Sequence, residues 1–522
     1  MAMRARTVLF VAAVVLTRVA GVPAASGPPA PAALTRGDLR WLARVTFGID
    51  TAMVARYRAL GRDKFLDEQL HPPAGDPLSL AAAVAALPVT RQSAQARLTA
   101  NRTEQQRINT LTNDDDKQAA RTVLNQAGNQ AAYETTKRHL MRALESPSQL
   151  REQLTWFWMN HFSVFSGKAN LRWTVAEYEE QAVRTHALGR FSDLVLATAV
   201  SPAMLEYLDN AQSAVGKMNE NYARELMELH TLGVSGGPSG STYTQGDVQE
   251  LARVLTGVGL NMTDTAPRLS PTQQALYVRR GLFEFNPTRH DVGPKTVLGH
   301  AIGGQGLGEL EDAVTFLCRQ PATARFISTK LATYFVADEP PPALVERMAR
   351  TFQKTDGDIG AVLHEMLLDR AFMAALNNPA SPLEKFKDPM QFVVSSMRLA
   401  YDGKVITNYH PAIGWLQQLG EPLYGRVTPD GYPLTEAAWS SSGQMVRRFE
   451  IARALGSGNA GLFNNEDSTP GPSTGFPLLT SRLFFDAIDR TLGARAHEAL
   501  GRTSSQQEWN TILLASPDWM QR

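Results

Sequence analysis

Apolar residues recur at spacings of three and four positions along most of this chain. That spacing places them along one side of an α-helix, whereas a half-buried strand would alternate apolar and polar residues. The first such segment opens with Thr35 and Asp38, spaced as a helix-capping box, and continues through Leu39 and Leu42. The sequence therefore predicts an all-α, or nearly all-α, fold. The same pattern fills residues 133–165, 170–209, 218–260 and 310–376.

Three segments depart from the helical pattern. Residues 276–299 contain short runs that look extended, followed by a loop with two prolines, and they predict a small β-hairpin. Residues 91–136 are polar and rich in Gln and Asn, which predicts an exposed helical hairpin or a mobile insertion. Residues 419–439 are rich in Gly and Pro and predict a long ordered loop. Since no clear linker divides the rest, we expect residues 35–522 to form one large intertwined domain.

The N-terminus has the order of a secretory signal peptide. Arg4 and Arg6 form a basic region, an uncharged apolar run covers residues 7–17, and small residues surround Pro23. The apolar run is about half of the ~20 residues that a membrane-spanning helix needs, so a permanent anchor is disfavoured. We therefore expect residues 1–24 to be a signal peptide for the general secretion route, and residues 25–34 to be a Pro- and Ala-rich spacer. This organisation predicts a periplasmic or secreted protein.

The charge balance and the cysteine count exclude two further classes of protein. Without residues 1–24 the chain has 49 basic and 51 acidic residues, so nothing suggests the concentrated basic face of a nucleic-acid-binding protein. Cys318 is the single cysteine, which rules out an intrachain disulfide. A chain of this length can bury enough apolar surface to be stable without one. We expect Cys318 to be a small buried side chain rather than a reactive thiol.

The densest polar cluster lies between Asn219 and Gly233. On a helix, Glu225 and Glu228 share a flank beside the apolar stripe, and Arg224 borders it. Such carboxylates are suited to bind a metal or to act as a general base, but they are equally explained by ion pairs with arginines. The next helix, at 244–256, also presents acids beside its core face. We therefore expect a buried or half-buried charged seam between the two helices, with arginines 224, 253 and 184 as partners.

Two histidines are further candidates for chemistry. His161 ends the aromatic run 156–162, where it is suited to be a metal ligand, a general acid or base, or a hydrogen-bonded core residue. His290 and Asp291 are adjacent in the irregular segment, and such a pair can bind a metal. The chain lacks the sequence signatures of serine esterases, zincins, phosphate-binding loops, dinucleotide-binding folds and c-type haem attachment.

Taken together, these segments resemble the bacterial family catalogued as domain of unknown function 1800. The most specific match is the run 219–234, followed by Tyr243 to Gly257. Supporting matches are residues 158–162, 187–189, 204–210, 290–295 and 514–519, so the resemblance extends from about Leu39 to Arg522. It implies an exported, mainly helical protein whose gene is often near one for an exported phosphatase- or sulfatase-like protein. It implies no established activity.

The chain departs from the family pattern at two positions. The family usually has His where Met159 stands, which leaves His161 as the one histidine of that cluster, and it usually has Trp where Val258 stands. The loss of a histidine weakens the expectation of a metal site there. The identity of any cofactor, including a divalent metal, is therefore not determined by the sequence.

Two functions remain open from the sequence. The first is an exported hydrolase that uses carboxylates and histidine. In that case we expect Glu225 or Glu228 to be the general base or metal ligand in a cavity shared with His161 and the His290–Asp291 loop, with Arg224 holding an anion. The second is a non-catalytic binding or maturation partner of another exported protein, in which each polar cluster only satisfies local packing.

The first prediction concerns export. We expect the mature chain to start at or near Ala25, because the small residues before it follow the apolar run as a signal-peptidase site does. N-terminal sequencing of the exported protein checks this. An intact Met1 in the membrane fraction would indicate an anchor instead.

Overall fold

The computed structural model of the chain describes residues 34–234, 242–263, 265–378, 380, 383–467, 469–471 and 475–522. The predicted signal peptide, and the spacer up to residue 33, lie outside the described residues. Residues 34–522 form one compact unit. No helix among the described residues combines the length and the apolar character needed to cross a membrane.

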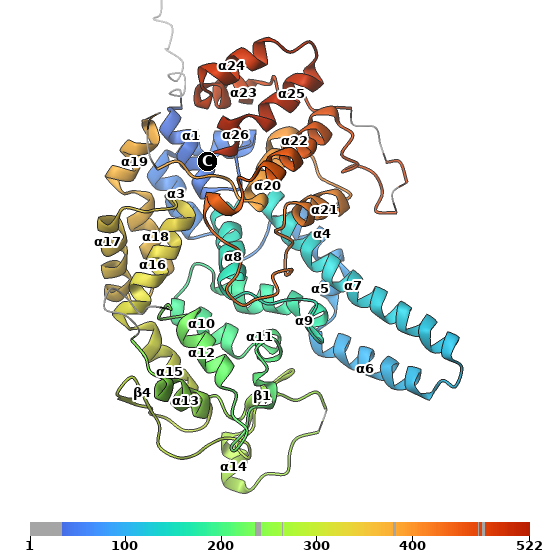
Figure 1. Cartoon of the computed structure of the whole chain (residues 1–522), viewed down its shortest axis with the longest axis vertical. Helices are drawn as coiled ribbons and strands as arrows, with labels where there is room; N and C mark the ends of the chain where they lie inside the picture. The colour runs from blue at the N-terminus through green and yellow to red at the C-terminus, as the bar shows by residue number, and fades with distance from the viewer. Residues whose placement is uncertain are drawn as a thin grey trace, which may run out of the picture. The chain divides into compact units, whose positions relative to one another are not determined.

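The described residues are mainly helical, which confirms the predicted fold class (Figure 1). The predicted capping box at Thr35 and Asp38 is present and starts the first helix. The first five helices are α1 (Arg36–Val45), α2 (Thr51–Leu60), α3 (Arg62–Leu70), α4 (Leu78–Ala86) and α5 (Pro88–Arg91).

Residues 91–136 do form a helical hairpin. Helices α6 (Ala94–Thr110) and α7 (Asp114–Glu145) lie side by side and project from the other helices (Figure 1). The outer part of the hairpin is mostly exposed, as its polar sequence predicts. Helix α7 continues beyond residue 136, however, and its last turns are buried. One long helix therefore begins in solvent and ends in the core.

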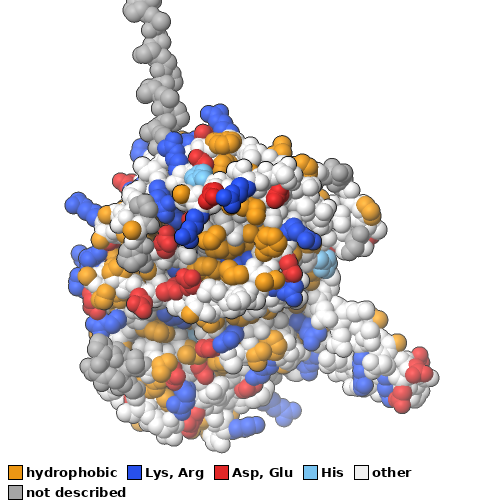
Figure 2. All heavy atoms as spheres, turned by 45° about the horizontal axis from the view of Figure 1, so that its top comes forward, with side chains coloured by type: hydrophobic (Ala, Val, Ile, Leu, Met, Phe, Trp, Pro, Cys, Tyr) orange, Lys and Arg blue, Asp and Glu red, His pale blue; other side chains and the backbone are white. Residues whose placement is uncertain are grey.

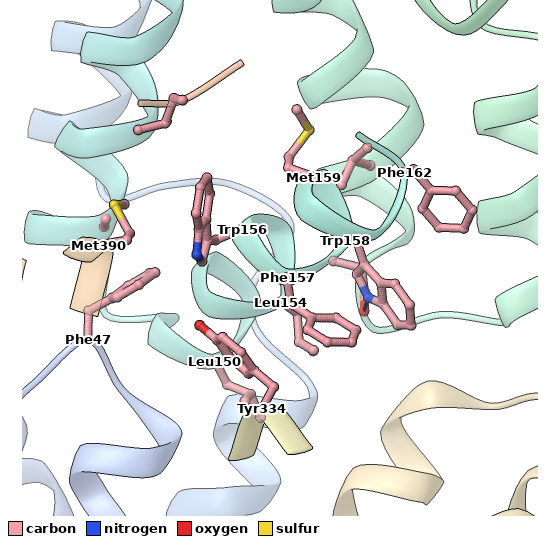
Figure 3. Close-up of a cluster of buried hydrophobic side chains, with 14 of the residues drawn as sticks. Phe47, Leu150, Leu154, Trp156, Phe157, Trp158, Met159, Phe162, Tyr334 and Met390 are labelled. Carbon is pink, nitrogen blue, oxygen red and sulfur yellow. Dashed lines mark hydrogen bonds between the residues drawn. The ribbon is translucent and has the colours of Figure 1, made fainter. Parts of the chain in front are cut away.

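Helix α8 (Gln149–His161) is the centre of the core. Every residue of α8 except Asn160 is buried, so the helix is surrounded on all sides. Figure 3 shows Leu154, Phe157 and Trp158 of this helix among apolar side chains from distant parts of the chain, such as Phe47 and Met390. Aromatic side chains at this density bury a large apolar area, which is the main driving force for folding.

The segment after α8 contains an unusual element. Helix α9 (Leu171–Glu177) runs directly into a π-helix, η1 (Tyr178–Val183), and then into a 3-10 turn, η2 (Arg184–His186). π-Helical turns are rare and are often found at functional sites. The following elements are α10 (Phe191–Ala199), α11 (Pro202–Tyr207), the 3-10 turn η3 (Asn210–Gln212), α12 (Glu220–Glu228) and α13 (Gln245–Val254).

The predicted β-hairpin is confirmed, with additional short strands around it. Strands β2 (Val278–Arg280) and β3 (Phe283–Phe285) are antiparallel, and β1 (Val258–Leu260) pairs with the other edge of β3. Strands β4 (Thr296–Val297) and β5 (His300–Ala301) form a second small sheet. Helix α14 (Pro271–Leu276) precedes β2.

The remaining helices complete the unit on both sides of α8 (Figure 1). Helix α20 (Pro389–Tyr401) is buried along its whole length, like α8. The other elements are α15 (Leu307–Cys318), α16 (Pro321–Phe335), α17 (Pro342–Lys354), α18 (Ile359–Leu367), α19 (Arg370–Asn377), α21 (His410–Gln418), the 3-10 turn η4 (Glu436–Ala438), α22 (Ser442–Ser457), α23 (Arg482–Asp486), the 3-10 turn η5 (Ile488–Thr491), α24 (Ala494–Gly501), α25 (Gln506–Ala515) and α26 (Pro517–Met520).

A buried ionic network fixes the π-helix against α7 and α8. Arg184 binds Asp76 at 2.7 Å and Glu152 at 2.8 Å, and all three side chains are at most 7% exposed. Arg142 of α7 binds Asp76 at 2.9 Å and also pairs with Glu180 of the π-helix. Buried charges are tolerated only when paired, so this network specifies where the π-helix lies.

The sequence predicts a charged seam between the helices at 219–232 and 244–256, and this prediction is wrong about the side chains that form the contact. Helices α12 and α13 do pack together, but half-buried Arg224 donates to the neutral side chain of Gln245 at 2.8 Å. Gln245 in turn donates to Glu220 at 2.6 Å. Arg253 pairs instead with Glu250 and with the loop after β3, and Arg184 belongs to the ionic network. Because the side-chain amide of Gln245 is neutral, the contact between α12 and α13 depends less on ion pairs.

The cysteine prediction holds. Cys318 is free and buried, and its burial raises the pKa of the thiol, which disfavours the reactive thiolate. On the surface, basic and acidic side chains are interspersed over the face that Figure 2 shows.

We expect Arg184→Ala to destabilise the fold by about 3–5 kcal/mol, because it removes the nearest cationic partner of two buried carboxylates. The matched control is Arg224→Ala, for which we expect about 1 kcal/mol because only a half-buried hydrogen bond to an amide is lost. Denaturant unfolding of both variants checks this. Equal losses of stability, or a larger loss for Arg224→Ala, would contradict the assignment of the network.

Candidate functional site

His161 ends α8 inside a cage of aromatic rings. It is 2% exposed, stacks parallel to Phe157 and touches the edge of Phe162. Its Nε2 lies 3.1 Å from the carbonyl oxygen of His230, and its Nδ1 lies 2.9 Å from the amine of Lys330. Burial, together with the charges of Lys330 and His230, lowers the pKa of His161 well below its usual value. His161 is therefore a neutral, hydrogen-bonded histidine.

Glu225 and Glu228 are half-buried on α12, on the flank that the sequence predicts. Burial and the charge of Glu228 raise the pKa of Glu225, although Arg224 opposes that rise. Glu228 accepts a hydrogen bond from the hydroxyl of Tyr243 at 3.0 Å. The raised pKa makes Glu225 a better proton acceptor than an ordinary surface glutamate.

His290 and Asp291 have different partners. The Nδ1 of His290 donates to the carbonyl of Thr256 at 2.7 Å, and its Nε2 lies 3.3 Å from Glu309 of α15. Asp291 accepts two hydrogen bonds from Arg253, at 3.0 and 3.1 Å. That contact, against the opposing effect of burial, lowers the pKa of Asp291 to about 2. The loop is thus fixed to α13 and α15 by its own side chains.

Among the described residues, no hydrogen bond or ion pair joins Glu225 or Glu228 to His161 or His290. Nor do the described residues contain a group of three or more His, Cys, Asp or Glu side chains arranged to hold a metal ion. The three sequence-predicted clusters therefore each have a separate set of partners.

A different group of polar side chains meets on the other side of α8. His139 near the end of α7 lies with its Nδ1 3.5 Å from Oε1 of Glu179 in the π-helix, and these side chains are 3% and 1% exposed. The hydroxyl of Tyr424 donates to the second oxygen of Glu179. Trp156 of α8 packs its ring edge-on against His139, with centroids 6.0 Å apart. We call His139 and Glu179 the buried dyad. Tyr424 is the tyrosine that binds it.

The dyad has unused hydrogen-bonding capacity. Neither Nε2 of His139 nor Oε1 of Glu179 makes a hydrogen bond to another described residue, although both atoms are buried. Buried polar atoms without a partner are costly and usually mark a bound water or a functional role. Burial alone would raise the pKa of Glu179, but the contact with His139 and the charges of Arg138 and Arg142 outweigh it and hold the pKa below its usual value. Glu179 is therefore an ionised carboxylate in the protein interior.

A cavity opens beside the dyad, between α8 and the loop 419–439. It encloses about 320 Å³ including its mouth, and its inner part is narrow, with room on the order of one water molecule. Met159 lines this cavity together with His139. Other lining residues are Trp156, Asn160, Ser163, Tyr424, Arg426 and Tyr432.

Three irregular backbone features hold the walls of the cavity. Glu179 lies in the π-helix, Tyr424 has a left-handed φ of 56°, and Gly431 has a φ of 77°. A non-glycine residue at positive φ costs about 1–3 kcal/mol and is found most often at functional sites. Tyr424 is held there because its carbonyl accepts hydrogen bonds from the backbone and the hydroxyl of Ser166, at 3.0 and 3.2 Å. Strain, burial and unpaired polar atoms thus coincide at this cavity.

Asn160 fastens the loop to α8. Its side chain donates to the carbonyl of Tyr432 at 2.9 Å and accepts from the backbone of the same residue at 2.5 Å. Gly431 comes so close that a Cβ atom there would lie 2.2 Å from the carbonyl oxygen of Asn160. The loop therefore requires glycine at this position for two reasons, its φ and its close approach.

His139 and Glu179 are not predicted from the sequence. Its helical pattern places residue 139 in one helix and residue 179 in the next helical segment, but singles out neither. The one local signal is the pair Glu179–Glu180 beside apolar residues that occupy the buried positions of that segment. In the π-helix, Glu179 contacts His139 and Glu180 contacts Arg142.

Comparison with known proteins identifies a family but no activity. A family model described as "Protein of unknown function (DUF1800)" matches residues 40–521. No curated protein and no solved structure matches the chain.

We expect Gly431→Ala to destabilise the loop 419–439 by more than about 1 kcal/mol, because the new methyl group would collide with Asn160. Gly420→Ala is the matched control. It has a similar φ of 80° but no neighbouring atom within 4 Å, so it adds backbone strain without the collision. Hydrogen exchange of the loop and denaturant unfolding measure the difference. If both variants behave alike, the close approach to Asn160 contributes nothing.

Proposed function

Because the chain belongs to the DUF1800 family, whose description names no activity, we propose a function from the site itself. The protein is an exported hydrolase in which His139, oriented by Glu179, acts as general base toward a water molecule. The observation that carries this proposal is a buried histidine with one nitrogen beside a buried carboxylate and the other nitrogen free, next to a cavity.

The two nitrogens of His139 have different roles in this arrangement. A carboxylate beside Nδ1 favours the tautomer that carries its proton on Nδ1, which leaves the lone pair on Nε2. This is the same logic by which a carboxylate orients the histidine of a catalytic triad. The Nδ1–Glu179 distance of 3.5 Å is long for a hydrogen bond, and catalytic contacts commonly tighten only when substrate is bound. When Nε2 takes a proton from water, ionised Glu179 stabilises the imidazolium that forms.

The surroundings support a base in this position. Arg142 and Arg138 keep Glu179 ionised, and Tyr424 fixes the orientation of its carboxylate. Trp156 and Met159 cover the cavity walls with apolar surface, which limits the access of bulk water and strengthens electrostatic interactions inside. The narrow interior has room for the attacking water molecule, and the substrate would lie in the open mouth near Arg426 and Tyr432.

The residues predicted from the sequence supply a second candidate centre for the same class of reaction. The raised pKa of Glu225 is the observation that favours it, with Glu228 and Arg224 beside it. His161, His290 and Asp291 are tied to other partners, so Glu225 would act there without them. We place the dyad first because it combines a histidine, a carboxylate and a cavity.

Export and partnership belong to the proposal as well. The order of basic, apolar and small residues at the N-terminus supports export. The family resemblance alone supports an exported phosphatase- or sulfatase-like protein as partner, and the non-catalytic role of a binding or maturation factor remains the alternative function. Co-purification of the two proteins from the native host tests the partnership.

Turnover of model substrates tests the hydrolase proposal. We expect the protein to cleave one class among nitrophenyl esters, phosphoesters, glycosides and chromogenic peptides. His139→Asn and Glu179→Gln should each lower kcat/KM by about 10²–10⁴, the usual contribution of a general base. Ser163→Ala should leave the rate within about twofold if water is the nucleophile.

Two further variants make the result specific. His497→Asn removes a surface histidine that lies 2.9 Å from Asp489, and it is the matched control for loss of a His–carboxylate pair. Glu225→Gln distinguishes the second centre from the first. Activity that survives His139→Asn but is lost in Glu225→Gln would move the site to α12. If no substrate class is cleaved, the binding or maturation role becomes the better proposal.

A further inference from the structure

Three arginines lie on one face of helix α1. Arg36, Arg40 and Arg44 are spaced at i, i+4 and i+8, so their side chains share one side of the helix. Like charges at this spacing repel one another and destabilise an isolated helix. Here the same face is turned into the protein, since the side chains of Arg36 and Arg40 are 19% and 7% exposed and Arg44 is fully buried. Burial strengthens the repulsion because less water screens it.

The three arginines line a cavity, together with Arg522. The cavity encloses about 220 Å³ including its mouth, and its inner part has room on the order of one water molecule. Burial lowers the pKa of Arg44, and the charges of Arg522 and Arg40 lower it further, so these cations are close enough to disfavour one another. The other lining residues are Ala375 and Leu376 of α19, Asn378, Leu383 and Glu384.

The charges of these arginines are poorly balanced. Among the residues that the structure describes, Glu384 is the one acid within ion-pair distance of the three arginines of α1, at 3.6 Å from both Arg36 and Arg40. Glu384 is 42% exposed, so water weakens its attraction for the guanidinium groups. The remaining partners are neutral, because Arg44 donates to three backbone carbonyls and Arg36 to one.

Three N–H groups of the same arginines have no acceptor. Nε of Arg36, Nη1 of Arg40 and Nε of Arg44 are buried and make no hydrogen bond to another described residue. A buried donor of a charged group is costly to leave without an acceptor. A water molecule in the cavity would supply an acceptor but would leave the repulsion among the arginines unchanged. An anion would supply the acceptor and also oppose that repulsion.

We propose that this cavity binds a chloride ion. A chloride ion is close to a water molecule in size, so it fits the inner part of the cavity, whereas phosphate and sulfate are too large for it. Charge-assisted hydrogen bonds from guanidinium groups hold the ion. Because the lining residues come from α1, from α19 and from Arg522, the ion joins residues near both ends of the described chain. The site is independent of the dyad and of any activity there.

Bromide tests the site directly, because it replaces chloride and is identified by its anomalous X-ray scattering. We expect crystals of the full chain grown in bromide to show an anomalous peak in this cavity, in contact with at least two of the three arginines of α1. Density without anomalous signal would mean a water molecule, and that result, or a cavity without density, would overturn the proposal.

The line width of the chloride NMR signal tests binding in solution, because exchange with a protein site broadens it. Arg40→Gln removes a charge and a free donor, so it should weaken chloride binding by about 10-fold or more. Arg447→Gln is the matched control. It removes one positive charge from a 53% exposed side chain paired with Glu450, and it should leave the binding constant unchanged.

Glu384→Gln tests the charge argument in a variant that keeps every arginine. Because the acid is partly exposed, its loss should leave the fold intact, and removing a competing negative charge should tighten chloride binding by about threefold or more. Weaker binding in Glu384→Gln would overturn the proposal. So would equal effects of Arg40→Gln and Arg447→Gln on the line width.

Discussion

The buried ion pairs among Asp76, Glu152 and Arg184 are the constraint on which the rest of this site depends. They bind the chain after the π-helix to α8 and to the segment before α4, in a region without solvent. A π-helical turn is less stable than an α-helical one, so it persists only where its surroundings require it. Arg142 adds the link to α7 through Asp76 and Glu180, and the same helix carries His139. The network thereby positions Glu179 next to His139.

The last three residues of α8 contact three different parts of the protein. Successive residues of a helix point about 100° apart, so consecutive positions reach different partners. Met159 lines the cavity of the dyad, Asn160 holds the loop at Tyr432, and His161 accepts the amine of Lys330. The loop 419–439 contributes to both sides, with Tyr424 at the dyad and Asp430 near Lys330. One helix end and one loop therefore contact both groups of side chains.

Much of the fold could be predicted from local patterns. The spacing of apolar residues predicts the helices, the capping box at Thr35 is present, and the extended runs near residue 280 form strands β2 and β3. These features are determined by residues that are close in sequence, so the spacing of apolar residues is enough to predict them. The chemistry of the seam between α12 and α13 could not be predicted in this way, because Gln245 competes with the acids for Arg224.

The candidate site was less predictable because its parts are distant in sequence. His139 and Glu179 are 40 positions apart, and Tyr424 follows 245 positions later. No spacing rule joins them, and the π-helix that brings them together interrupts the helical period on which sequence analysis relies. Glu225, Glu228 and His161 attracted attention because they stand in dense local clusters. Polar residues that are dense along the chain need not meet in the folded protein. His161 and His290, for example, have separate partners.

The central claim is that Nε2 of His139 is kept free for a water molecule by the contact of Nδ1 with Glu179. A high-resolution crystal structure tests it most directly, through the electron density inside the cavity between α8 and the loop 419–439. The account predicts one ordered water about 2.7–3.1 Å from Nε2, the distance of a normal hydrogen bond. A cavity without density beside Nε2, or a rotated ring whose Nε2 binds Glu179, would contradict it.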